Sequence, residues 1–176
     1  MNALDHFSVP YKGLGNGIHH LKFFVDSDFF KEFEDAHLDN GKFEIDVELD
    51  KRHDHSILMF SISGTTKTSC DRCLSAIDLP SSGEYKLHVK HGEREGSNDE
   101  IMFIHPETSI LNLAQVVYEF VSLSVPIIKT YDCDLEDNPP CNFEVLNRLN
   151  EEDGDAEEGN VEGGVWDSLK DLDLSN

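Results

Sequence analysis

Basic residues are scarce in this sequence: 14 Lys and Arg stand against 36 Asp and Glu, and the formal net charge at pH 7 is −22. Because affinity for phosphate groups comes largely from Lys and Arg, this shortage argues against a general binder of nucleic acids or anionic membranes. Long apolar runs are also missing, since no stretch approaches the roughly 20 residues that a transmembrane helix needs. The N-terminal residues show no basic segment followed by a continuous apolar one, so no signal peptide is predicted. We therefore expect a cytoplasmic protein with no membrane partner.

The sequence patterns of common enzyme sites are missing as well. The stretch GLGNG, residues 13–17, lacks the Lys-Ser/Thr that completes a phosphate-binding loop, and neither GxSxG nor HExxH occurs. No pattern assembles a nucleophile, a base and an orienting group. We therefore expect a protein that is not an enzyme and has no small-molecule substrate.

The length of 176 residues suits one hydrophobic core, but an apolar content of 38% indicates that part of the chain is not packed. Residues 1–150 form the predicted folded domain. The stretch EEDGDAEEGNVEGG, residues 151–164, has no apolar pattern and predicts a disordered acidic linker. Residues 165–176 predict a short amphipathic helix that docks on its own domain or on a partner, through Val165, Trp166, Leu169 and Leu172.

The clearest structural signal is strict alternation in KFEIDVELD, residues 42–50, which predicts a half-buried strand with an acidic outer face. HSILMFSIS, residues 55–63, predicts its hairpin partner. Further strands are predicted at 18–25, 83–91 and 101–105. The main helix is predicted over 109–126, where polar residues recur at roughly helical spacing and Pro126 ends the pattern.

Two weaker helical patterns lie at 27–37, after a potential N-cap, and at 143–150. Together the elements predict an α+β fold. An antiparallel sheet of five or six strands, which could close into a barrel, packs against one long buried helix.

Four cysteines are present, and in a cytoplasmic protein we expect them to be reduced thiols or metal ligands rather than disulfides. Cys70 and Cys73 form a Cys-x-x-Cys. A redox pair of this kind sits at a helix N-terminus, which lowers the thiol pKa, but the sequence that follows here is β-like and reaches Pro80. A dithiol oxidoreductase is therefore disfavoured.

A structural zinc ion is a second interpretation of the cysteines. One tight turn can aim the thiolates of Cys70 and Cys73 at a single ion, and Cys133 and Cys141 could supply the other two ligands. The second pair is spaced more widely than usual in zinc sites. Four free thiols that bind nothing are the third interpretation. If zinc binds, its role is structural, and we expect Cys70→Ser to destabilise the fold.

Other clusters have simpler explanations. His19-His20 and His53-x-His55 would point to opposite faces of strands or to solvent, although histidines such as His88 and His91 could replace a cysteine ligand. The acidic strand face is interpreted as a solvated surface or as a surface for a basic partner. It consists of Glu44, Asp46, Glu48 and Asp50.

The order of several features resembles a known family. CDRCL at 70–74 follows β-rich sequence, and a long helical segment then ends in Leu-Ser-x-Pro at 123–126. A cysteine-containing stretch, an acidic linker and a terminal Trp-x-x-Leu-x-x-Leu come next. Over about residues 15–173 the chain thus resembles the YceD family, the large ribosomal RNA subunit accumulation proteins.

The resemblance implies a small protein of bacteria and plastids that supports the accumulation or processing of 23S ribosomal RNA and has no catalytic residue. Some members of the family carry extra cysteines after the proline that look like the rest of a zinc site. Here only Cys133 and Cys141 match that region.

The acidic charge bears on how such a protein would reach a precursor of the large ribosomal subunit. A direct contact with 23S ribosomal RNA would need a local site, for which Lys67 and Arg72 beside the cysteine turn are the candidates. We favour docking onto a basic ribosomal protein through the acidic strand face and tail, because such complementarity speeds encounter. The alternative is a zinc-stabilised protein-interaction adaptor unrelated to ribosomes.

Overall fold

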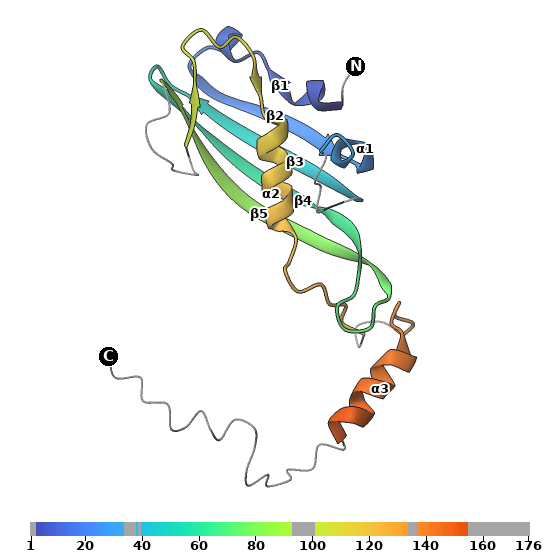
Figure 1. The fold of residues 1–176 in the computed structure, drawn as a ribbon. Coiled ribbons are helices and arrows are strands. Elements are labelled where there is room, and N and C mark those ends of the chain that lie inside the picture. The colour runs from blue at the N-terminus through green and yellow to red at the C-terminus, as the bar shows by residue number, and fades with distance from the viewer. Residues whose placement is uncertain (1–2, 34–37, 39, 93–100, 134–136, 155–176) are drawn as a thin grey trace, which may run out of the picture. The chain divides into compact units, whose positions relative to one another are not determined.

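The main sheet of the computed structural model has five strands in the order β2–β3–β4–β5–β6 (Figure 1). Neighbouring strands are antiparallel from β2 to β5, whereas β6 runs parallel to β5. The α+β class and the mostly antiparallel sheet are therefore confirmed. The strand bounds are Gly17–Val25 for β2, Gly41–Lys51 for β3, His55–Ser69 for β4, Ala76–His91 for β5 and Ile101–Ile104 for β6.

The sheet is open in the part of the chain that the structure describes, so the prediction that it could close into a barrel is wrong. β2 and β6 lie at its two edges and do not pair with each other. Closing a barrel requires the edge strands to pair along their length, but β6 has only four residues.

The half-buried strand predicted at 42–50 is confirmed as β3, with apolar residues on one face and charged residues on the other. Phe43, Ile45, Val47 and Leu49 are all buried, while the acidic residues between them lie on the other face. Strands β4 and β5 are longer than predicted. Their pairing runs from His55 opposite Lys90 to Ser69 opposite Ala76. Pro80 lies within β5, opposite Thr65.

One face of the sheet is covered by α2, Ala114–Ser124, which lies across β4 and β5 (Figure 1). The ring of Phe120 stacks on Tyr85 and meets Phe60 edge-on. Phe7, from the 3-10 helix Ala3–Phe7, stacks on Phe23 of β2 and extends this core. On the opposite face, the side chains of β3 between its buried residues are exposed or half-buried.

Helix α2 is shorter than the predicted span of 109–126. Leu111–Asn112 instead form β7, which pairs with β1, Ser8–Val9. The side-chain oxygen of Asn112 then accepts a 2.8 Å hydrogen bond from the N–H of Ala114 and so helps to begin the helix. Among the described helices, none is long and apolar enough to cross a membrane.

The N-terminal segment is attached to the sheet through a second 3-10 helix, Tyr11–Gly13. The ammonium group of Lys51 donates hydrogen bonds to the carbonyls of Tyr11 and Leu14, at 2.6 and 2.7 Å. The Tyr11 hydroxyl bonds the buried hydroxyl of Ser56 at 2.7 Å. The predicted helix at 27–37 is reduced to α1, Ser27–Phe30, capped by Asp26; part of its remaining span lies outside the described residues.

The structure describes residues 3–33, 38, 40–92, 101–133 and 137–154, and it divides the chain into two compact units between Cys141 and Asn142. The second unit contains α3, Phe143–Gly154. This helix includes the predicted 143–150 pattern and continues to Gly154, into the span predicted as linker. The rest of the linker and the predicted terminal helix, with Trp166, Leu169 and Leu172, lie outside the described residues.

Candidate functional site

The Cys-x-x-Cys lies in the turn between β4 and β5. The N–H of Cys70 donates to the carbonyl of Ser75 at 2.8 Å, and the N–H of Leu74 donates to the carbonyl of Cys70 at 2.9 Å. Leu74 has a φ of 60°, a left-handed conformation that is uncommon for a residue other than glycine. The turn leads directly into β5, so the two thiols do not stand at a helix N-terminus.

Both thiols of this turn are buried, with exposures of 1% for Cys70 and 0% for Cys73, and neither forms a disulfide. A reactive thiol needs access to solvent and a positively charged environment. The burial of both sulfurs therefore favours a structural role over a dithiol redox centre.

The segment after α2 is fastened to the cysteine turn through Asp71. Its N–H donates to the carbonyl of Lys129 at 2.7 Å, and one of its carboxylate oxygens accepts a 2.7 Å hydrogen bond from the N–H of Lys129. These two bonds join residues 58 positions apart. They bring the turn alongside the chain that leads to Cys133.

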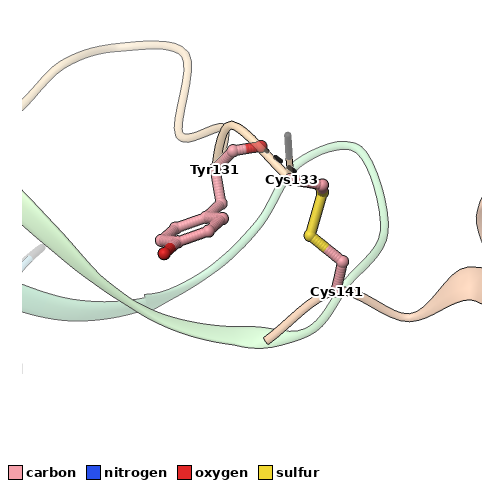
Figure 2. Close-up of a disulfide and its surroundings, with 3 residues drawn as sticks. All are labelled: Tyr131, Cys133 and Cys141. Atoms are coloured by element: carbon pink, nitrogen blue, oxygen red, sulfur yellow. Dashed lines mark hydrogen bonds between the residues drawn. A yellow bond between two sulfur atoms is a disulfide. The ribbon is translucent and has the colours of Figure 1, made fainter. Parts of the chain in front are cut away.

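Cys133 and Cys141 form a disulfide (Figure 2). Their Cα atoms are 6.2 Å apart, within the range that a disulfide spans. The expectation that all four cysteines are reduced thiols or metal ligands is therefore wrong for this pair in the structure.

The disulfide makes a direct prediction about thiol accessibility. When the protein is isolated without a reducing agent and then denatured, we expect iodoacetamide to modify two cysteines, Cys70 and Cys73, and four after reduction. Mass spectrometry of the intact chain counts the added groups. Modification of four cysteines without reduction would contradict the disulfide, and one bound zinc ion in that sample would support the zinc interpretation instead.

The second candidate surface is the face of the sheet opposite α2. The register of β2 to β5 places Lys22, Asp46, Ser61 and Glu84 in one row. Asp46 and Glu48 are well exposed, with side-chain exposures of 59% and 49%. This face therefore carries the acidic row that the alternation in β3 predicts.

Charge on the acidic face is only partly neutralised. Lys22 pairs with Glu44, and its ammonium group lies 3.4 Å from an Asp46 carboxylate oxygen. The hydrogen bond to Glu44 raises the pKa of Lys22. Desolvation opposes this rise, and the charges of Asp46 and Glu44 add to it. Asp50 is paired with Arg52 at 2.7 Å. Apolar side chains are interspersed with these charges, since Phe24 is 67% and Met59 41% exposed.

Comparison with protein families adds the deciding observation. The model of the family described as large ribosomal RNA subunit accumulation protein YceD matches residues 58–173. The matched region begins within β4, includes the cysteine turn and α2, and covers more than half of the chain. The chain belongs to the YceD family. Searches of curated proteins and of solved structures gave no match.

Family membership confirms the resemblance deduced from CDRCL and the features that follow it, over residues 58–173. Within this YceD protein, Lys67 lies in β4 and Arg72 in the cysteine turn, and both are exposed. The histidine pairs form no metal cluster: among the described residues, no group of three or more His, Cys, Asp or Glu side chains could hold a metal ion.

The four cysteines do not fit a zinc site in the disulfide-bonded form, because zinc is bound by thiolates and two of the sulfurs are bonded to each other. Zinc therefore stays a prediction that concerns the fully reduced chain. Cys70, Cys73, Cys133 and Cys141 would be its ligands there.

Lys129 is a residue that the sequence did not single out. It lies in an irregular segment with no periodic pattern, and its partner Asp71 is far away in sequence. The only available signal was the position of Lys129 between the helix-ending Pro126 and Cys133. That proximity does not reveal a hydrogen bond to the cysteine turn.

Proposed function

We propose that this protein is a non-enzymatic factor in the cytoplasm that supports the accumulation and processing of 23S ribosomal RNA during assembly of the large ribosomal subunit. The observation that carries the proposal is the YceD family match over residues 58–173, since the family is named for accumulation of the large-subunit ribosomal RNA. The net charge of −22 indicates that attachment to a precursor does not depend on a broad basic surface.

The proposed partner is a basic protein of the large-subunit precursor, and the proposed contact is the acidic face of the sheet. The carboxylates of β3, together with Glu84 of β5, give this face its charge, and the exposed ring of Phe24 and thioether of Met59 can contact apolar groups. Complementary charge raises the rate of encounter with a basic surface, while the apolar contacts lengthen the lifetime of the complex.

A structural zinc ion is a further element of the proposal. Disulfides are rare in the reducing cytoplasm, so Cys133 and Cys141 would be thiols there. With Cys70 and Cys73 they would provide four sulfur ligands, which leave no open position for catalysis. Metal analysis of protein kept reduced throughout purification tests this element: absence of zinc, with the same melting temperature with and without a chelator, would refute it.

Sedimentation of the tagged protein from its native lysate on a sucrose gradient tests the proposed function. We expect the protein to migrate with large-subunit precursors, detected by a probe for 23S precursor RNA, at low salt and to be released at high salt. A protein confined to the top of the gradient at low salt would contradict the proposal.

A charge variant tests the proposed surface. We expect Asp46→Asn combined with Glu48→Gln to reduce co-sedimentation at low salt, because the variant removes two exposed carboxylates from the acidic face. The matched control is Glu107→Gln combined with Glu119→Gln, which changes the net charge equally but lies away from that face. Equal losses in the two variants would show that only the overall charge matters.

A further inference from the structure

A groove of about 400 Å³ lies where β4 extends past β3. β3 begins at Gly41, opposite Thr66, whereas β4 continues past this point to Ser69 beside β5. Among the described residues, Thr68 and Ser69 therefore have no strand beside them on that side, and the segment after α2 lines the same groove. The groove is lined by Leu38, Lys67, Thr68, Ser69, Ala76 and Lys129, among others.

The groove is lined by two basic residues, although the molecule as a whole is strongly acidic. Lys67 and Lys129 both line it, and within the described part of the chain neither makes a salt bridge, unlike Lys12 and Lys22. Asp78 is the cross-strand neighbour of Lys67 but does not pair with it among the described contacts. Among the described residues, these two ammonium groups therefore have no carboxylate partner.

Hydroxyl groups add neutral donors to the two ammonium groups. Thr68 and Ser69 line the same groove, and neither hydroxyl donates or accepts a hydrogen bond within the described residues. Ammonium and hydroxyl groups together form the donor set that proteins use for phosphate oxygens. Leu38, which is 8% exposed, adds an apolar wall beside them.

The backbone holds both lysines in place. Lys129 is fixed by its two 2.7 Å bonds to Asp71, and the N–H of Lys67 donates to the carbonyl of Asn40 at 3.2 Å. One carboxylate oxygen of Asp71 already accepts the hydrogen bond from the backbone N–H of Lys129. A site whose backbone is already ordered loses less conformational entropy when a ligand binds.

We propose that this groove binds a phosphate group of the ribosomal RNA backbone. The proposal rests on the proposed function, which supplies the RNA. It reconciles a direct RNA contact with the net charge of −22, because one or two phosphates can enter a local site that the acidic face does not share. An extended peptide added beside Thr68 and Ser69 of β4 would use backbone bonds and would leave the two lysines without a role.

Fluorescence anisotropy of the full-length chain with a labelled single-stranded RNA of about ten nucleotides tests the site. We expect Lys67→Gln combined with Lys129→Gln to weaken binding roughly 50-fold at about 0.05 M salt. The slope of log affinity against log salt should fall by about 0.7 if one phosphate enters the groove and by about 1.4 if two do. Lys67→Arg combined with Lys129→Arg should retain binding, because the charge is kept.

The charge-matched control is Lys86→Gln combined with Lys90→Gln, two exposed positions of β5 that do not line the groove. Equal weakening in this control, or an unchanged salt slope in the groove variant, would overturn the proposal. So would binding of inorganic phosphate without binding of RNA, or binding of a basic β-strand peptide that is insensitive to the two lysines. A negative anisotropy result would overturn the groove and leave the proposed function intact, because the acidic face would still dock on its basic partner. Failure of the unaltered protein to sediment with the precursor would instead remove the function itself.

Discussion

Replacing Phe60 by alanine is expected to lower the free energy of unfolding by about 3–5 kcal/mol. The side chain is fully buried at 0% exposure, and its ring meets that of Phe120 with centroids 5.0 Å apart. Truncation would remove this contact between β4 and α2 and leave a cavity in the middle of the core. Because small domains have only about 5–15 kcal/mol of stability, this is a large fraction of the total.

Urea unfolding followed by circular dichroism measures this change. The control is Phe24→Ala, since Phe24 is also a strand phenylalanine but is 67% exposed on the face opposite α2. Its removal should cost about 1 kcal/mol or less. Similar losses for the two variants would contradict the assignment of the core to the α2 side of the sheet.

The second large effect is expected from Gly64→Ala, at about 3 kcal/mol, the upper end for an overpacked site. Gly64 pairs with Phe43 between β3 and β4. A methyl group at position 64 would stand 2.2 Å from the carbonyl oxygen of Lys42 and 2.7 Å from the Cα of Phe43. Both neighbours are backbone atoms of a central strand, so the two strands would have to separate locally.

Thermal melting of Gly64→Ala against Gly15→Ala checks this result. A methyl group at position 15 would have nothing within 4 Å, so the control isolates the general effect of replacing glycine. An unchanged melting temperature for Gly64→Ala would show that β3 and β4 are not as closely paired at this point as their register requires.

The sequence predicted those parts of the fold that depend on local periodicity. Alternation between apolar and acidic residues determined β3, because a strand with one buried face must repeat every two residues. The start of α2 could not be found in the same way, since Leu111 and Asn112 fit a helical pattern and are drawn into β7 by pairing with Val9 and Ser8. Pairing between residues so far apart leaves no local signal.

The candidate sites were predictable to different degrees. The acidic face follows directly from β3, and CDRCL with its following features predicted the family. The sequence did not predict the disulfide between Cys133 and Cys141, because cysteines of a cytoplasmic protein are expected to be reduced. The groove was missed because it is formed by the ends of two strands and by Lys129, whose position depends on the hydrogen bonds of Asp71.

The order of strands has a consequence for the folding of the nascent chain. β2, β3, β4 and β5 pair with their neighbours in the order in which they leave the ribosome, so this meander can form early from contacts of modest sequence separation. The apolar side of the meander stays exposed until residues 114–124 emerge, because α2 covers it. The β1–β7 pair likewise must wait for Leu111 to return to Val9. Until then the half-made protein exposes Phe60 and its neighbours to other chains, and we expect this interval to be the one in which it most needs a chaperone.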